Sequence, residues 1–385
     1  MATPKLHFET LAIHAGQEPD PNTGAVMQPI VLSTTFSQDG PGAHKGYEYT
    51  RSDNPNRRSL EICLASLEGA SHGLAFSSGC AAISTVMQLL SPGDHVVACD
   101  DVYGGTRRLF DQVFSPLGLK ISWVDLADAS ALSNTLQDNT RLVWIETPTN
   151  PMLKLLDIRA LSQTCAAAKI PLAVDNTFAT PMLQRPLELG ASLVVHSMTK
   201  YLNGHSDVLG GAVLTNDDEL AQRLRFLQNA VGAVPSPFDC FMVLRGLKTL
   251  PVRMHQHCVS AKHLSRWLSD HPGVKRVIYP GLQSHPQHAL AQQQMLDFGG
   301  IISFEVEGGR AAAVALLKSV RIFTCAESLG GVESLIELPV MMTHASVPED
   351  VRQELGISAG LIRISVGLEN VEDLQNDLNF GLNAA

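Results

Sequence analysis

The chain has 385 residues, of which 45% are hydrophobic and 17% are charged. Its 38 acidic residues outnumber its 28 lysines and arginines, so the net charge is −10 and no basic surface for nucleic acid is expected. It contains no run of about 18 apolar residues, so a membrane span is not expected.

The seven cysteines are scattered and form no CxxC pair, which argues against a disulfide framework and a zinc site. The first residues contain no apolar core of a secretion signal. A reducing cytoplasm is therefore the expected compartment.

Residues 1–45 contain scattered prolines and glycines and are predicted to form an extended arm that reaches a neighbouring subunit. Tyr49 and Arg51 follow, before a helix predicted over residues 56–68. The planar guanidinium of Arg51 could bind a phosphate or a carboxylate, although a single loop arginine more commonly lies in solvent.

Residues 73–76 predict a strand that enters a turn of small residues and then a helix over residues 80–90. Gly79 and Cys80 stand at the start of this helix, where free N–H groups favour a phosphate. Small residues also allow a ligand to approach the backbone. An ordinary tight turn is the alternative.

Apolar strands alternate with helices through the next part of the chain. Strands are predicted over residues 95–99, 119–124, 141–146, 170–175, 193–195 and 210–214, and helices over 105–117, 128–137, 157–168 and 217–229. This alternation predicts an α/β fold with a parallel, doubly wound sheet, whose ligands bind at the carboxyl ends of the strands.

Two of these strand ends carry residues suited to an aldehyde cofactor. Lys200, between the hydroxyls of Ser197 and Thr199, could hold such a cofactor as a Schiff base. Asp175 ends the preceding strand and could pair with a protonated ring nitrogen. The alternatives are a lysine with its amine in water and an aspartate that caps a helix.

Two further loops face the same expected edge of the sheet. Tyr103 could stack on a planar cofactor and supply a phenol proton, or it could be a buried structural tyrosine. Asn150 could hydrogen-bond the phenolic oxygen of a cofactor, or it could belong to a plain Asn-Pro turn.

A long connecting helix is predicted over residues 238–270, and the last third then changes rhythm. Strands near 274–279, 300–306 and 361–366 alternate with helices near 309–318 and 371–383, which predicts a smaller α+β domain. The histidine pairs in this part lack a third ligand at a suitable spacing, so no metal site is expected.

Arg363 lies inside the last predicted strand, and a buried arginine needs a partner. A substrate carboxylate would suit it, and a structural ion pair with a protein acid is the alternative. Glu327 and Ser328 lie in a polar, glycine-rich loop that is also suited to chemistry.

Several motifs together resemble the Cys/Met-metabolism pyridoxal-phosphate enzymes, in order and spacing and nearly from end to end. They are Tyr49-x-Arg51, Ser78-Gly79, Asp101-x-Tyr103-Gly-Gly105-Thr, Glu146-x-Pro-x-Asn150-Pro, Val174-Asp175-Asn-Thr, Ser197-x-Thr-Lys200-Tyr-x-Asn-Gly-His205 and Ala326-Glu327-Ser328-Leu-Gly-Gly.

The resemblance implies an aminotransferase-like fold of type I, with a mostly parallel, seven-stranded sheet. It implies an arm at 1–45, a cofactor-binding domain at 46–245 and a C-terminal α+β domain at 246–385. It also implies a homotetramer, built as a dimer of dimers, with active sites shared between subunits.

The resemblance assigns the site residues as follows. Lys200 and Tyr103 would be catalytic. The residues that would bind pyridoxal 5′-phosphate are Tyr49 and Arg51 of a neighbouring subunit and Gly79, Cys80, Tyr103, Asp175, Ser197, Thr199 and Lys200. The residues that would bind the amino-acid substrate are Asn150, Glu327, Ser328 and Arg363. Cys80 departs from the apolar residue that is usual in the family, and it would act through its backbone N–H.

Within the family, the chain is most similar to carbon–sulfur lyases that split cystathionine by α,γ-elimination into cysteine, 2-oxobutyrate and ammonia. Gly104-Gly105-Thr106 lacks the cysteine of methionine γ-lyases. Glu327 resembles the acidic residue of the γ-lyases and γ-synthases. γ-Replacement on an acylhomoserine, β-elimination and a non-catalytic cofactor-binding role stay open as alternatives.

Overall fold

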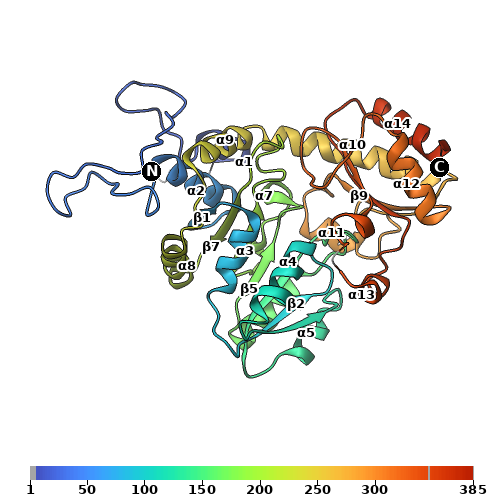
Figure 1. Cartoon of the computed structure of the whole chain (residues 1–385), viewed down its shortest axis with the longest axis horizontal. Coiled ribbons are helices and arrows are strands. Elements are labelled where there is room, and N and C mark those ends of the chain that lie inside the picture. The colour runs from blue at the N-terminus through green and yellow to red at the C-terminus, as the bar shows by residue number, and fades with distance from the viewer. Residues whose placement is uncertain (1–5, 346, 385) are drawn as a thin grey trace.

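Two β-sheets organise the computed structural model, which describes residues 6–345 and 347–384 (Figure 1). Within these residues, one sheet has seven strands in the order β1-β7-β6-β5-β4-β2-β3, and the other has five in the order β10-β11-β12-β9-β8. The predicted α/β class, with a mostly parallel sheet and a smaller C-terminal sheet, is confirmed.

The larger sheet is built from short apolar strands in the first 215 residues. They are β1 His72–Phe76, β2 His95–Cys99, β3 Lys120–Val124, β4 Thr140–Glu146, β5 Leu172–Asp175, β6 Leu193–Ser197 and β7 Gly211–Thr215. β7 runs antiparallel to both of its neighbours, β1 and β6. A loop of residues 198–210 joins β6 to β7 without a crossover helix, so the chain reverses there, and Lys200 lies in this loop.

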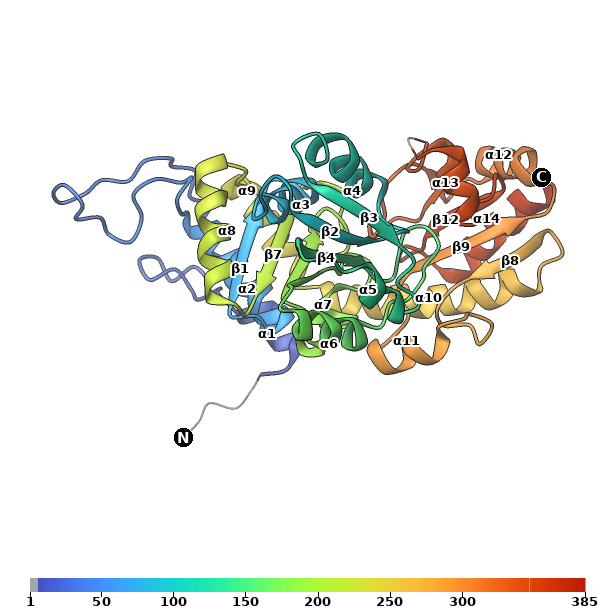
Figure 2. The same cartoon turned by 90° about the horizontal axis from the view of Figure 1, so that it is seen from below.

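Helices cover this sheet on both faces (Figure 2). They are α1 Phe8–His14, α2 Pro55–Glu68, α3 Gly79–Met87, α4 Gly104–Leu109, a π-helical turn Phe110–Phe114, α5 Ser130–Thr135, α6 Ile158–Ala168, α7 Thr180–Leu183, a 3-10 turn Pro186–Leu189, α8 Asp218–Val231, α9 Pro237–Leu247 and α10 Leu250–Asp270. Among all the described helices, none has the length and apolar character needed to cross a membrane.

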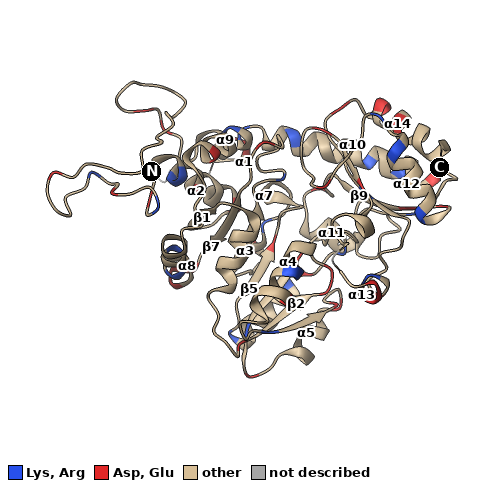
Figure 3. Ribbon diagram, viewed as in Figure 1, with Lys and Arg blue, Asp and Glu red and all other residues tan. Residues whose placement is uncertain are grey.

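The smaller sheet and its helices form the C-terminal part. Its elements are β8 Val274–Ile278, α11 His288–Gln294, β9 Ile301–Val306, α12 Gly309–Ser319, β10 Thr324–Cys325, β11 Leu335–Glu337, a 3-10 turn Pro339–Met341, α13 Glu349–Glu354, β12 Leu361–Ser365 and α14 Val371–Ala384. The division into domains at residue 246 stays a proposal. In Figure 3, basic and acidic residues are interspersed over both parts.

Two predictions about helices were wrong. The single helix expected over 238–270 is broken between α9 and α10, because Pro251 has no N–H and fits only the first turn of a helix. The arm at 1–45 was expected to be extended throughout, but α1 forms within it and buries Ala12. Residues 1–5 of this arm lie outside the described part of the chain.

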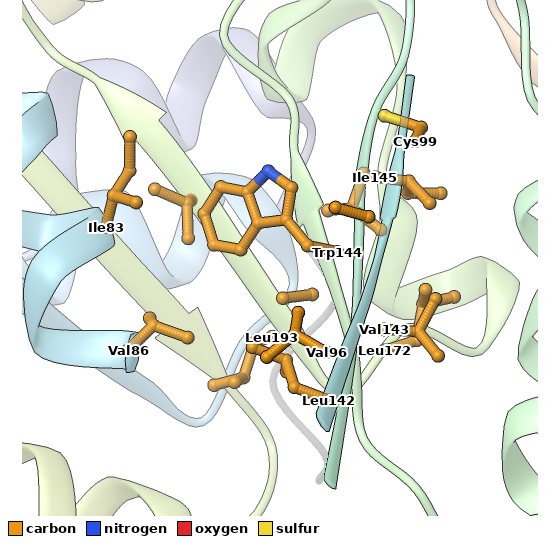
Figure 4. Close-up of a cluster of buried hydrophobic side chains, with 14 of the residues drawn as sticks. Ile83, Val86, Val96, Cys99, Leu142, Val143, Trp144, Ile145, Leu172 and Leu193 are labelled. Carbon is orange, nitrogen blue, oxygen red and sulfur yellow. The ribbon is translucent and has the colours of Figure 1, made fainter. Parts of the chain in front are cut away.

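Trp144 of β4 is the largest of the fully buried side chains and organises the core of the larger sheet. Its indole ring points toward Ile83 of α3 and away from Ile145 (Figure 4). The ring of Phe110 meets it edge-on, with 5.6 Å between ring centroids. This packing fixes β4, whose end carries the loop of Asn150, against the helix that begins at Gly79.

We therefore expect Trp144→Ala to lower the free energy of unfolding by about 3–5 kcal/mol, because it removes a large buried ring and leaves a cavity. Urea unfolding followed by circular dichroism measures this change. Leu117→Ala is the matched control, since Leu117 is 64% exposed and its truncation should change stability little. Equal effects of the two substitutions would contradict this account of the core.

Candidate active site

A cavity of about 260 Å³ lies at the carboxyl ends of β4, β5 and β6. Most of the predicted site residues line it: Gly79, Cys80, Tyr103, Asn150, Asp175, Ser197, Thr199, Lys200, Glu327, Ser328 and Arg363. The structure thus brings together residues that are up to 284 positions apart in the chain, from Gly79 to Arg363. Their individual roles stay predictions.

Lys200 is partly buried, and its Nζ donates a hydrogen bond to Oγ of Ser328 at 2.7 Å. Burial lowers the pKa of the Lys200 amine to about 8, and the positive charge of Arg363 acts in the same direction. The neutral, nucleophilic form of the amine is therefore far more populated near neutral pH than in an exposed lysine. The alternative of a strand-end lysine with its amine in water is wrong.

Ser328 places its hydroxyl on Lys200 through an unusual backbone conformation. Its φ is 97°, in a region that residues other than glycine rarely adopt. Nη2 of Arg363 donates to the carbonyl oxygen of Ser328 at 2.7 Å, which holds the peptide in this conformation. Arg363 therefore orients the hydroxyl group that contacts the lysine.

Asp175 is 7% exposed, and its position follows from the register of parallel strands. Its Cα pairs with that of Glu146 in β4 on one side and with that of Val195 in β6 on the other. The Thr177 N–H and hydroxyl both donate to Oδ1 of Asp175, at 3.0 and 2.6 Å, so Oδ2 is available for a ligand. The alternative of an aspartate that caps a helix is wrong, because the next helix, α7, has Ala179 at its N-cap and the contacts of Asp175 with Thr177 form a local turn instead.

Burial and neighbouring groups determine the acidity of the Asp175 carboxyl and of the Glu146 carboxyl beside it. Burial raises the pKa of the Asp175 carboxyl, while the Thr177 hydrogen bonds lower it. Burial, together with the charge of Asp175, raises the pKa of Glu146 well above its ordinary value. Glu146 is therefore the more readily protonated of the two, and a cationic ligand near them would pair with Asp175.

The start of α3 provides an anion-binding corner. Ser78 caps the helix by accepting the Ala81 N–H at 3.0 Å, and the N–H groups of Gly79 and Cys80 precede the first intrahelical bonds. A Cβ at Gly79 would lie 3.0 Å from Cβ of Ser197, so glycine lets that hydroxyl approach the helix.

The Thr199 hydroxyl completes this corner from the loop that carries Lys200. It is held by Gly210, whose N–H donates to it at 3.1 Å. Burial raises the pKa of the Cys80 thiol, so that side chain is neutral beside the corner. The two hydroxyl groups and the helix N-terminus together match a phosphate group in donor type and charge.

Tyr103 forms the side of the cavity at the start of α4. Its N–H donates to Oε2 of Glu146 at 2.8 Å, which fixes the backbone from which the ring projects. A Cβ at Gly105 would collide with the Tyr103 ring, so glycine is required there. Burial raises the pKa of the phenol, which therefore keeps its proton at neutral pH.

Arg363 is 2% exposed, and the ion pair with a protein acid that was its alternative is present, whereas its binding of a substrate carboxylate stays a prediction. It forms an ion pair with Glu337, with 3.1 Å between Nη1 and Oε1, and Nη1 also donates to Oδ1 of Asn150 at 2.9 Å. Its Nε has no hydrogen-bond partner within the described residues, which leaves a donor for a carboxylate. Sequence reasoning missed Glu337, because β11 has only three residues and no strand signal.

Tyr49 and Arg51 do not line the cavity of their own chain. Both are exposed, and Nη1 of Arg51 donates to the carbonyl oxygen and Oδ1 of Asn229, at 2.6 and 2.9 Å. The binding of the cofactor of a neighbouring subunit by Tyr49 and Arg51 stays a prediction.

Residues that line the cavity without having been assigned a role are Ser78, Ile83, Glu146, Thr177, Phe178, Val195, Leu209, Leu329 and Thr343. Glu146 stood in a quoted motif and at a strand end, which was the available signal. No group of three or more histidine, cysteine or acidic side chains within the described residues could hold a metal ion.

Comparisons with known proteins identify relatives of this chain. The family model described as Cys/Met metabolism PLP-dependent enzyme matches residues 9–383. The chain is 54% identical to cystathionine gamma-lyase of Dictyostelium discoideum, covering 97% of each chain, and 53% identical to cystathionine beta-lyase of Coxiella burnetii, covering 98% of each.

A solved structure gives the same picture. Cystathionine gamma synthase from Xanthomonas oryzae pv. oryzae, in complex with aminoacrylate and cysteine, superposes with a TM-score of 0.96. It is 47% identical, and the match covers 99% of both chains. The predicted fold class and family resemblance are confirmed by these matches.

The low pKa of Lys200 predicts the pH dependence of its labelling by a small aldehyde in the cofactor-free protein. The neutral amine is the form that reacts, and its population rises with pH, so reductive labelling of Lys200 should rise through a midpoint near pH 8. Mass spectrometry measures this by residue. Lys154 is an internal control, because ion pairs with Asp100 and Asp125 raise its pKa.

Arg363→Gln should shift that midpoint to higher pH, because it removes a positive charge that disfavours the ammonium form of Lys200. A native Lys200 midpoint at the ordinary value of an exposed lysine would contradict the assigned environment. So would a downward shift in the variant.

Proposed function

Because the chain belongs to the Cys/Met-metabolism PLP-dependent enzymes, we propose that it converts L-cystathionine and water into cysteine, 2-oxobutyrate and ammonia by α,γ-elimination. Curated relatives named cystathionine gamma-lyase that are 52–54% identical over nearly the whole chain support this reaction. The cofactor of the enzyme is pyridoxal 5′-phosphate.

The cavity fits this cofactor in its donor groups and charges. The corner at α3 has the N–H groups and hydroxyls that a phosphate requires, Lys200 supplies a nucleophilic amine, and Asp175 keeps an oxygen available for a pyridine nitrogen. Gly105 leaves room for the Tyr103 ring that would lie along the cofactor. When bound, pyridoxal phosphate supplies an electron sink that stabilises negative charge on a bound amino acid.

Lys200 and Tyr103 would move the protons of the reaction. The Lys200 amine, with its pKa of about 8, can accept the proton from Cα of the substrate near neutral pH and can release it again. The Tyr103 phenol keeps its proton and can donate it, as can the Lys200 ammonium, to the departing sulfur. Elimination also removes a proton from Cβ and breaks the bond between Cγ and sulfur.

The placement of charges in one cavity is the observation that carries the choice of substrate. Arg363 is buried beside Lys200 and would bind the α-carboxylate next to the reacting carbon, together with Asn150 and Ser328. Glu327 lines the same cavity but is exposed, so it can meet the ammonium group at the far end of a longer substrate. Cystathionine has an amino-acid group at each end of a thioether and matches both.

Two rival reactions have specific support in the comparisons. The relative from Coxiella burnetii is named a β-lyase, and the structure from Xanthomonas oryzae pv. oryzae is of a γ-synthase. A synthase would add cysteine to an acylated homoserine, and a β-lyase would form pyruvate and homocysteine from cystathionine. The exposed carboxylate of Glu327 offers a partner for the cysteine half in either γ-reaction and so disfavours only the β-lyase. The relatives named cystathionine gamma-lyase, 52–54% identical, favour the lyase over the synthase.

We further propose a homotetramer, a dimer of dimers, in which Tyr49 and Arg51 complete the cofactor site of a neighbouring subunit. The exposure of both residues and their distance from their own cavity support this arrangement. A cytoplasmic location is supported by the seven free cysteines.

Product analysis tests the proposed reaction. The purified enzyme with L-cystathionine should release 2-oxobutyrate and cysteine. A parallel reaction of O-succinylhomoserine with cysteine should accumulate little cystathionine. Pyruvate and homocysteine as the main products would identify a β-lyase, and accumulation of cystathionine in the second reaction, with none consumed in the first, would identify a γ-synthase.

Lys200→Ala should lose the visible absorbance of the lysine-bound cofactor and almost all turnover, because the attachment point and the proton acceptor disappear together. Spectroscopy and coupled detection of 2-oxobutyrate measure the two effects.

A substitution of Glu327, which is exposed in the same cavity, tests substrate binding separately from cofactor attachment. Glu327→Gln should keep the absorbance and raise the KM for cystathionine about 10-fold, the loss of one charge-assisted contact. An unchanged KM would remove Glu327 from substrate binding.

A further inference from the structure

Arg57, near the start of α2, is a buried cation that the proposed reaction does not use. Its side chain is 2% exposed, and it does not line the catalytic cavity. A guanidinium in such a place loses its hydration and is stable only when its N–H groups find acceptors. Two of its acceptors are main-chain oxygens of one short loop. In Figure 3, the basic start of α2 lies where the projecting N-terminal segment joins the body.

That loop carries Tyr49 and Arg51. Nη1 of Arg57 donates to the carbonyl oxygen of Thr50 at 2.7 Å, and Nη2 donates to that of Arg51 at 3.2 Å. Asn54, which caps α2, donates through Nδ2 to the Thr50 hydroxyl at 3.2 Å. The backbone of the loop is therefore fixed, while the side chains of Tyr49 and Arg51 remain at the surface.

Glu61 connects this arrangement to the main sheet. Its Oε1 lies 3.8 Å from Nε of Arg57, which has no hydrogen-bond partner within the described residues. Oε1 also accepts the Ala75 N–H at 2.9 Å and Nε2 of Gln228 at 3.0 Å. Ala75 belongs to β1, which leads to Gly79. The charge pair thus links the exposed loop to the strand that ends at the anion-binding corner.

We propose that Arg57 is a positioning residue, which holds the Tyr49–Arg51 loop in the conformation that completes the cofactor-phosphate site of a neighbouring subunit. This inference rests on the proposed function, in which those two side chains serve a neighbouring site. Arg57 would act on that site only through the loop. An arginine that merely stabilised its own subunit would change unfolding without changing cofactor affinity in a partner.

Arg57→Lys tests the positioning role. Lysine keeps the charge and the aliphatic chain, but it cannot donate to two carbonyl groups from one planar fork. The dissociation constant of pyridoxal phosphate, titrated by fluorescence of the cofactor-free oligomer, should rise about 10-fold, the equivalent of about 1.4 kcal/mol. Arg225→Lys is the matched control, because Arg225 also contacts Glu61, at 3.5 Å, but is 50% exposed and makes no contact with the loop carbonyls.

Mixed oligomers test whether the effect crosses between subunits. Arg57→Lys chains and Lys200→Ala chains, carrying different tags, are assembled together and purified. Borohydride trapping of the cofactor on Lys200 then reports only the Arg57→Lys chains. An Arg57→Lys chain that is paired with a Lys200→Ala chain has its cofactor site completed by a loop with native Arg57. A fraction of the Arg57→Lys chains should therefore trap the cofactor on Lys200 at the pyridoxal phosphate concentration that suffices for the native enzyme.

The remaining outcomes separate this inference from its premise. Arg51→Ala chains mixed with Lys200→Ala chains should regain native trapping if sites are shared, and failure of that pair would reject the shared site. Two outcomes would reject the role of Arg57 while leaving the shared site intact. One is trapping that recovers in the Arg51→Ala mixture but not in the Arg57→Lys mixture. The other is native cofactor affinity in Arg57→Lys itself. If Arg57→Lys does not fold, Arg57→Met with Glu61→Gln replaces it, since that pair leaves no buried charge and keeps the acceptor for Ala75.

Discussion

The hydrogen-bonded register of three parallel strands determines where the chemistry of this protein takes place. β4, β5 and β6 pair so that Glu146, Asp175 and Val195 stand side by side. Ser197 lies two residues after Val195, at the end of β6, and the chain then turns into the loop of Lys200. A shift of one residue in any of these strands would turn its side chains to the opposite face of the sheet. The hydrogen-bonded register of the strands therefore brings the carboxylate of Asp175, the hydroxyl of Ser197 and the amine of Lys200 to one cavity.

The electrostatic surroundings then shift the pKa of the ionisable side chains in the cavity. Burial drives the carboxyls and the lysine toward neutrality. The charge of Arg363 lowers the pKa of Lys200, and Glu337 raises it. The residue proposed to bind the substrate carboxylate thus also helps to keep the neighbouring amine nucleophilic. This double use explains why an arginine is buried at such a cost beside a lysine.

The sequence was sufficient for the elements that have strong local signals. The strand that ends at Asp175, the strand that precedes the loop of Lys200, the turn before α3 and the change of rhythm near residue 274 all follow from apolar runs and small residues. The break before α10 was readable from Pro251 but was overridden by the helical pattern around it. α1 is too short to show a clear period.

Long-range pairings were beyond local reasoning. The Arg363–Glu337 ion pair and the raised pKa of Glu146 arise from packing between segments that no periodicity connects. Sequence reasoning could ask for a partner for the buried arginine, but it could not say that a protein carboxylate and a free Nε would both be present.

The two halves of the cavity come from different sheets. The residues proposed for the cofactor lie at the ends of the seven-stranded sheet, whereas Glu327, Ser328 and Arg363 belong to the five-stranded sheet and its loop after β10. Substitution of Glu327 can therefore alter which substrate is held without removing the cofactor attachment, whereas Ser328, which accepts a hydrogen bond from Lys200, couples the same loop to that attachment.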